Sequence, residues 1–214
     1  MALPPLTHRL AYNTTYIISR FISLNFLRLR LFGTRNIPSS SGGLICGNHQ
    51  SFLDPILYGL ASPYRLNYLA RKTLFEVPIL KEIIPMHNAI PIDRDGMGLQ
   101  GIKTTLKRLK EKELVLIFPE GTRSSDGELL PLKTGFCTLA RRAKTPLIPA
   151  GIDGPFTIWP RHEKLPHRLA QVCICYGRPI ESSEYENLSD EELTAELASR
   201  IQECFEKCRK TVSS

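Results

Sequence analysis

From residue 43 onward, short apolar runs alternate with segments of helical periodicity, and this alternation constrains the fold more than any other feature of the sequence. The predicted strands are the apolar runs 44–47, 66–70, 89–92, 114–118, 147–152 and 172–176. The predicted helices between them are 55–61, 78–84, 97–111 and 134–143. Because strands separated by helices usually pair in parallel, we predict an α/β domain with a largely parallel sheet flanked by helices.

A last helix is predicted near the C-terminus. Ser189 and Glu192 form a capping-box pattern that marks its start. Apolar residues then recur every four positions at 193, 197, 201 and 205, as on one face of a helix. Acids lie near the start and bases near the end, so the charges complement the helix dipole and its acidity is mostly a solvated face.

The positive charge of the chain is concentrated at its beginning. The net charge is +7, and five arginines but no acid precede Asp54. Residues 10–32 contain no Gly or Pro and are rich in Leu, Ile and Phe, which predicts an amphipathic helix. We therefore divide the chain into a membrane-associating N-terminal helix, residues 1–32, and one domain, residues 33–214. A basic and apolar segment fits a membrane surface better than nucleic acid.

No part of the sequence is typical of a membrane-spanning helix or a signal peptide. A spanning helix needs about 18 or more apolar residues, and arginines interrupt the N-terminal apolar segment. We therefore expect a peripheral or monotopic protein on the cytoplasmic face of a membrane, without a transmembrane span.

Two pairs of cysteines have the spacings of metal ligands. Cys173 and Cys175 would share one face of a strand, and Cys204 and Cys208 one face of a helix. No further ligand cluster accompanies either pair in the sequence, so we interpret them as small buried side chains and predict no metal site.

The first candidate for chemistry is the pair of His49 and Asp54, directly after the predicted strand 44–47. Asp54 precedes Pro55, so it is a natural N-cap with the proline starting the helix. A carboxylate five residues after a histidine, across a strand-to-helix turn, can fold back onto the imidazole. It would then fix one tautomer and raise the basicity of the ring, as a general base requires.

The second candidate is the loop that follows the predicted strand 114–118. It gathers a carboxylate, a glycine, two hydroxyl groups and an arginine, which are Glu120, Gly121, Thr122, Arg123 and Ser124. Glycine lets backbone approach a ligand, and arginine suits bidentate contact with phosphate. This composition indicates an anion site.

Two further bases follow predicted strands, Lys72 after 66–70 and Arg94 after 89–92. The carboxyl ends of parallel strands lie on one edge of the sheet, where ligands bind in open α/β folds. We therefore expect these bases to converge with His49 and the 120–124 loop. A base beside several cations indicates deprotonation of a hydroxyl group on a phosphate-bearing substrate.

These residues resemble the glycerolipid acyltransferases, and in particular the 1-acylglycerol-3-phosphate acyltransferases. Residues 48–54 are similar to the family's His-x4-Asp block, and residues 118–124 match its Glu-Gly-Thr-Arg block. Residues 92–94 resemble the second block and residues 146–150 the proline block, so the resemblance covers about residues 33–180. The second block departs from the family pattern at Asn88 and Pro91.

The resemblance implies a glycerol-3-phosphate acyltransferase-like fold and a catalytic role for residues 33–214. The reaction it implies is transfer of a fatty acyl group from an acyl thioester, on coenzyme A or acyl carrier protein, to the free hydroxyl of a lysophospholipid. With 1-acyl-sn-glycerol 3-phosphate the product is phosphatidic acid, for phospholipid biosynthesis. No cofactor, metal or nucleic acid is implied.

The resemblance also assigns roles to the candidate residues. His49 is the general base, Asp54 orients it, and no covalent enzyme intermediate forms. The substrate-binding residues are Lys72, Arg94, Glu120, Gly121, Thr122, Arg123 and Ser124. The three cations hold the phosphate, and a backbone N–H near the His49 or Gly121 turn stabilises the oxyanion.

Four other interpretations remain open from the sequence. The acceptor could be another lysophospholipid, or a thioesterase could use the same His49 and Asp54 to activate water. The chain could instead be a catalytically inactive lipid-binding protein. A nucleic-acid module is suggested by bases in 103–112, but the apolar stripe of 97–111 indicates an ordinary amphipathic helix with a solvated basic face.

Overall fold

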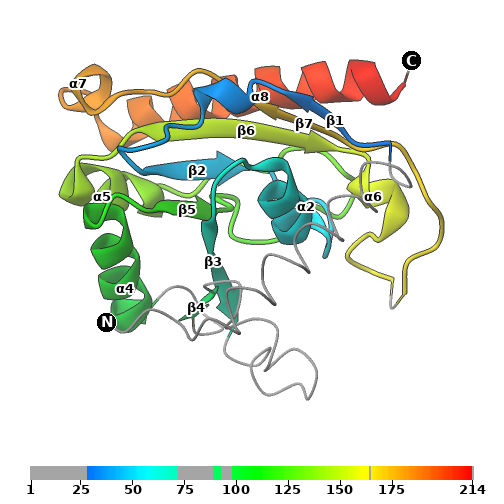
Figure 1. Ribbon diagram of the computed structural model, residues 1–214, viewed down its shortest axis with the longest axis horizontal. Helices are drawn as coiled ribbons and strands as arrows, with labels where there is room; N and C mark the ends of the chain where they lie inside the picture. The colour runs from blue at the N-terminus through cyan, green and yellow to red at the C-terminus, as the bar shows by residue number, and fades with distance from the viewer. Residues whose placement is uncertain (1–27, 72–88, 93–97, 164, 214) are drawn as a thin grey trace.

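Within the residues that the computed structural model describes, 28–71, 89–92, 98–163 and 165–213, seven strands form one sheet (Figure 1). The strands are β1 (Arg30–Phe32), β2 (Gly43–Gly47), β3 (Leu66–Arg71), β4 (Ala89–Ile92), β5 (Leu114–Ile117), β6 (Leu147–Asp153) and β7 (Cys173–Tyr176). Their order is β1-β7-β6-β2-β5-β3-β4, and every neighbouring pair is parallel except β6 and β7. The predicted α/β fold with a largely parallel sheet is confirmed.

Four of the predicted helices are confirmed, at 54–61, 98–110, 135–143 and 190–212, and three short helical elements were not predicted. The helical elements are η1 (Thr34–Asn36), α2 (Asp54–Ala61), α4 (Gly98–Lys110), α5 (Gly135–Ala143), α6 (Pro155–Ile158), α7 (Ser182–Tyr185) and α8 (Asp190–Val212). The capping box of α8 is confirmed, because Ser189 Oγ accepts the Glu192 N–H and the Glu192 carboxylate accepts the Ser189 N–H. The predicted helix 78–84 lies outside the described residues.

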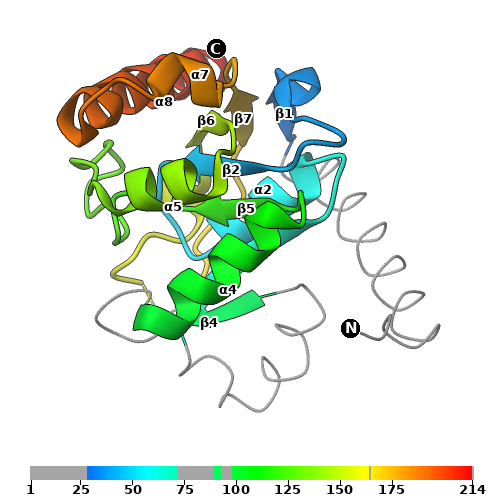
Figure 2. The ribbon, with the colours of Figure 1, turned by 90° about the vertical axis from the view of Figure 1, so that its left-hand side faces the viewer.

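The sheet buries apolar side chains on both faces. Helices α4, α5 and α8 cover one face (Figure 2). On this face the side chains of Phe136, Leu139, Leu197 and Ile201 pack against the strands. Helices α2 and α6 cover the other face. Central strands buried on both sides read as continuous apolar runs, and all five residues of β2 are buried.

The predicted N-terminal helix, residues 10–32, is wrong at its C-terminal end. Residues 30–32 form the edge strand β1, parallel to β7, and residues 1–27 lie outside the described residues. Arg28 has a φ of +44°, which interrupts a right-handed helix, and the Arg30 N–H donates to the Val172 carbonyl at 2.8 Å, which draws residues 30–32 into the sheet.

The two cysteine pairs, treated as separate in the sequence, come together between β7 and α8. Cys173, Cys175, Cys204 and Cys208 form one buried cluster, with Phe32 and Val212 packed against it. A hydrogen bond with Cys204 and the nearby Lys207 ammonium lower the pKa of Cys175 to about 7. All four are free thiols, and the described residues hold no group of three or more His, Cys, Asp or Glu arranged to bind a metal. Their burial agrees with the prediction that they are small buried side chains.

Candidate functional site

His49 lies at the carboxyl end of the central strand β2, in the turn that leads to α2. Its Nδ1 is 2.8 Å from Asp54 Oδ2. The histidine side chain is 17% exposed and the aspartate is fully buried, so the pair lies at the surface with its carboxylate protected from solvent. This contact confirms the prediction, made from the spacing, that the Asp54 carboxylate folds back onto the imidazole.

Asp54 also organises the turn itself. Its Oδ2 accepts the backbone N–H groups of Gln50 at 2.6 Å and Ser51 at 2.7 Å. The prediction that Asp54 is the N-cap of α2 is wrong, because the cap position is Leu53 and Asp54 is the first helical residue. Its carboxylate points back toward the turn, so one oxygen fixes both the loop and the imidazole.

The ring of Phe118, directly after β5, stacks on the imidazole of His49. The ring centroids are 3.9 Å apart and the planes are inclined by 12°. One face of the imidazole is therefore covered, and Nδ1 is engaged with Asp54. Nε2 is then the ring nitrogen that does not face Asp54 and could accept or donate a proton.

Glu120 lies behind His49 and braces its backbone. Oε1 accepts the His49 N–H at 2.7 Å, and Oε2 accepts the Leu130 N–H at 3.0 Å. Burial raises the pKa of Glu120 to about 7, against the lowering effect of these two hydrogen bonds. Both oxygens face the protein, so Glu120 shapes the site.

The other residues of the 120–124 loop differ in their exposure to solvent. Gly121 and Thr122 are exposed, and Gly121 has a φ of +73°, a conformation that favours glycine. The Arg123 guanidinium lies 3.4 Å from the centroid of the Phe52 ring. Ser124 is buried, and its Oγ binds Asp126 Oδ1 at 2.7 Å and accepts the Gly127 N–H at 3.0 Å.

The backbone of His49 ties the two motifs together. In addition to the bond from its N–H to Glu120, its carbonyl accepts the Ser124 N–H at 2.8 Å. The amides of Gln50, Ser51 and Gly121 likewise donate to protein oxygens. These amides therefore already have acceptors within the protein, and stabilisation of an oxyanion by another amide near the His49 or Gly121 turn stays a prediction.

Lys72 and Arg94, the other two predicted cations, lie outside the described residues. The strands that precede them are described, and β3 pairs in parallel with both β4 and β5. Because β2 and β5 are also parallel, the four strands end at the same edge of the sheet, where His49 lies.

Three residues near the site were not singled out from the sequence: Phe118, Phe52 and Arg161. Arg161, on the loop after α6, donates from Nη1 to Thr122 Oγ1 and to the Arg123 carbonyl, both at 3.3 Å. Both phenylalanines lie within the motif blocks 48–54 and 118–124, so an aromatic residue inside a motif was the available signal. Arg161 is 39 residues from Thr122 and carried no such signal.

This fold and site define an α/β enzyme in which a histidine–carboxylate pair lies beside an arginine-bearing loop. The sequence model of the family described as Acyltransferase matches residues 28–153. The chain belongs to this family, and the protein is an acyltransferase.

Named relatives are similar over most of the chain. A 1-acyl-sn-glycerol-3-phosphate acyltransferase of Bacillus subtilis (strain 168) is 33% identical over 184 residues, which cover 84% of this chain and 89% of the relative. A chloroplastic 1-acyl-sn-glycerol-3-phosphate acyltransferase of Brassica napus is 31% identical over 78% of this chain, which spans about half (49%) of that relative.

A solved structure has the same fold. The crystal structure of the 1-acyl-sn-glycerophosphate acyltransferase PlsC from Thermotoga maritima superposes with a TM-score of 0.79 at 21% identity. The match covers 95% of this chain and 82% of that one. In the part of the chain that is described, no helix is long and apolar enough to cross a membrane.

Proposed function

We propose that this acyltransferase moves a fatty acyl group from an acyl thioester to the free hydroxyl of 1-acyl-sn-glycerol 3-phosphate, which produces phosphatidic acid. The observation that carries the proposal is the 2.8 Å contact between His49 Nδ1 and Asp54 Oδ2, beside the loop that bears Arg123. The names of the two relatives support the same acceptor.

In this mechanism, His49 Nε2 removes the proton of the acceptor hydroxyl as its oxygen attacks the thioester carbonyl. Asp54 holds the Nδ1–H tautomer and stabilises the imidazolium that forms. The tetrahedral intermediate then expels the thiolate, which takes the proton from the imidazolium and leaves as a thiol. The acyl group passes directly between the substrates, without a covalent enzyme intermediate.

The acceptor phosphate is assigned to the cations at the same edge of the sheet. Arg123 is held on the Phe52 ring, which orients its guanidinium. Lys72 and Arg94 remain proposed partners because they follow strands that end at this edge. Thr122 and Gly121 border the anion site on the exposed side of the loop, while Glu120 and Ser124 give the loop its shape.

The protein is proposed to work at a membrane surface, peripherally on its cytoplasmic face. The N-terminal segment is basic and apolar, and each arginine near an anionic surface adds roughly 1 kcal/mol of binding. Because residues 30–32 belong to the sheet, the proposed membrane helix is limited to residues 1–27. The acyl donor is acyl-coenzyme A or acyl carrier protein.

Mass spectrometry of the products tests the proposal. Purified protein is supplied with acyl-coenzyme A or acyl-acyl carrier protein, and with 1-acyl-sn-glycerol 3-phosphate or a lysophospholipid with a larger headgroup. Phosphatidic acid as the main product supports the proposal. Preference for the larger headgroup would correct the acceptor, and free fatty acid without acylated product would indicate a thioesterase.

A further inference from the structure

The loop between α6 and β7 comprises residues 159–172, all described except residue 164, and hydrogen bonds hold its first part. The Trp159 indole donates to the Glu163 carbonyl at 3.1 Å, and the His167 N–H donates to the Ile158 carbonyl at 2.9 Å. At its start, Ser51 Oγ donates to the Trp159 carbonyl at 2.6 Å. The start of this α6–β7 loop is therefore anchored to the turn that carries His49.

Two leucines of the α6–β7 loop face the solvent. Leu165 is 73% exposed and Leu169 is 65% exposed, and among the large apolar side chains in the described residues Leu99 alone is more exposed. Exposure of apolar side chains to water is unfavourable, and burial in an apolar phase would relieve it. Their position on an ordered loop indicates an apolar partner.

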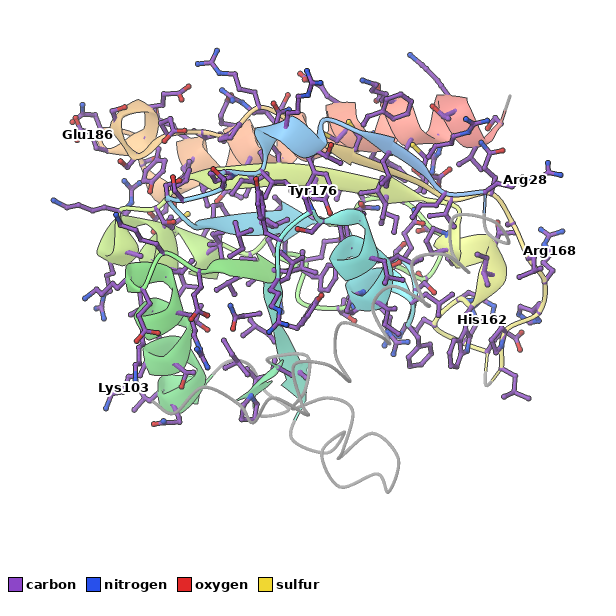
Figure 3. All side chains as sticks on the ribbon, viewed as in Figure 1. Arg28, Lys103, His162, Arg168, Tyr176 and Glu186 are labelled. Carbon is purple, nitrogen blue, oxygen red and sulfur yellow. The ribbon has the colours of Figure 1, made fainter. Side chains whose placement is uncertain are left out.

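The same loop is basic. Arg161 and Arg168 are both exposed, and Glu163 is the one acid in residues 159–172. That carboxylate lies 3.6 Å from His167 and 3.9 Å from His162. Figure 3 shows Arg168 and His162 at one end of the molecule, opposite Lys103 of α4. The loop therefore combines apolar side chains with cations that complement an anionic surface.

The α6–β7 loop adjoins both the candidate site and the start of the described chain. Arg161 contacts Thr122 and the carbonyl of Arg123. The Arg30 N–H donates to the Val172 carbonyl at 2.8 Å, so the N-terminal segment enters the sheet beside the end of this loop. A membrane or protein surface that contacted this loop would therefore also lie close to the Arg123 side of the candidate site.

We propose that the α6–β7 loop is a membrane-contacting surface, with Leu165 and Leu169 in the interface and Arg161 and Arg168 against anionic headgroups. The inference rests on the proposed function, since a lipid acceptor requires the site to face a bilayer. An acidic protein would also be attracted by the arginines. The two exposed leucines favour the bilayer, because it offers an extended apolar phase.

Vesicle co-sedimentation of the full chain tests this inference, with neutral phosphatidylcholine vesicles and with vesicles that also contain phosphatidylglycerol. The double substitution Leu165→Ser with Leu169→Ser is expected to weaken binding to both by about tenfold. Arg168→Gln is expected to weaken only binding to the anionic vesicles, by about fivefold at low salt. Leu99→Ser is the matched control and is expected to change neither, because it alters an exposed leucine on α4.

The same variants are assayed with a short-chain acceptor that is soluble as a monomer. The leucine variant is expected to retain wild-type turnover there and to need about tenfold more vesicles for the same rate on vesicle-bound acceptor. Unchanged vesicle binding by the leucine variant would overturn the inference. It would also be overturned if that variant slowed only the reaction with acyl carrier protein, since the loop would then dock a protein. Failure of the wild-type protein to acylate the soluble acceptor would instead refute the proposed function, independently of vesicle binding.

Discussion

One oxygen of Asp54 holds both the imidazole of His49, at 2.8 Å, and the two amides that shape the turn around it, those of Gln50 and Ser51. The position of the proposed base and the conformation of its loop therefore depend on the same carboxylate. Loss of that carboxylate affects chemistry and folding together.

Asp54→Asn is expected to reduce kcat by at least about 10², because the amide group no longer stabilises an imidazolium. The free energy of unfolding is expected to fall by about 1 to 3 kcal/mol, since a neutral oxygen accepts the buried amides less strongly. Steady-state kinetics and urea denaturation measure the two effects. Glu111→Gln, at an exposed carboxylate after α4, serves as the control. Activity within a few fold of wild type would remove Asp54 from the mechanism.

Glu120 is expected to make stability depend on pH. Its pKa is raised from 4.5 to about 7 in the folded protein, so the folded state holds this proton more tightly than the unfolded state does. The resulting stabilisation is fully present below pH 4.5 and is lost as the pH rises to about 7. The loss should amount to about 3 kcal/mol.

Glu120→Gln isolates this effect because glutamine does not titrate. The free energy of unfolding is measured for both proteins from pH 4.5 to pH 8. As the pH rises, the wild type should lose stability relative to Glu120→Gln. A difference that stays constant over this range would show that Glu120 is not protonated in the folded protein at neutral pH.

Phe52→Leu tests the support of Arg123. The guanidinium lies 3.4 Å from the centroid of the Phe52 ring, and a cation–π contact of this kind is worth about 0.5 to 1 kcal/mol at an exposed site. We expect KM for the phosphate-bearing acceptor to rise about two- to fivefold, with little change in KM for the donor. Ile56 is another exposed apolar residue and lies on α2, whereas Phe52 precedes that helix. Ile56→Ala should leave both KM values unchanged. Equal changes in the two variants would argue against a role for the stacking.

Ser124→Ala separates a structural role from substrate contact. Its hydroxyl accepts the Gly127 N–H, so its removal is expected to lower the free energy of unfolding by about 1 kcal/mol. KM for the acceptor should stay close to wild type, because the side chain is buried and faces the loop. A large rise in that KM with unchanged stability would instead place the hydroxyl on the substrate.

The strands and helices were predictable wherever one periodicity dominated, as in the buried run of β2 and the apolar stripe of α8. The end of the N-terminal helix was not, because the segment around Leu29 and Arg30 fits both a helix and an edge strand. Pairing with β7, more than 140 residues further along the chain, selects the strand, and local sequence does not reveal that pairing.

In the candidate site, too, local contacts were predictable and long-range contacts were not. The pair of His49 and Asp54 is local, and its spacing predicted the contact. The bond from the His49 N–H to Glu120 spans 71 residues, and the contact between Arg161 and Thr122 spans 39. Spacing within a motif does not reveal such contacts, because they depend on how the sheet brings separate loops to one edge.

The most direct test of the account is the activity of His49→Ala with an acyl thioester and 1-acyl-sn-glycerol 3-phosphate. Positioned proton transfer contributes about 10² to 10⁴ in rate, so kcat/KM should fall by that factor while circular dichroism and the thermal midpoint stay near wild type. A folded His49→Ala protein that acylates the acceptor at close to the wild-type rate would contradict the assignment of His49 as the general base.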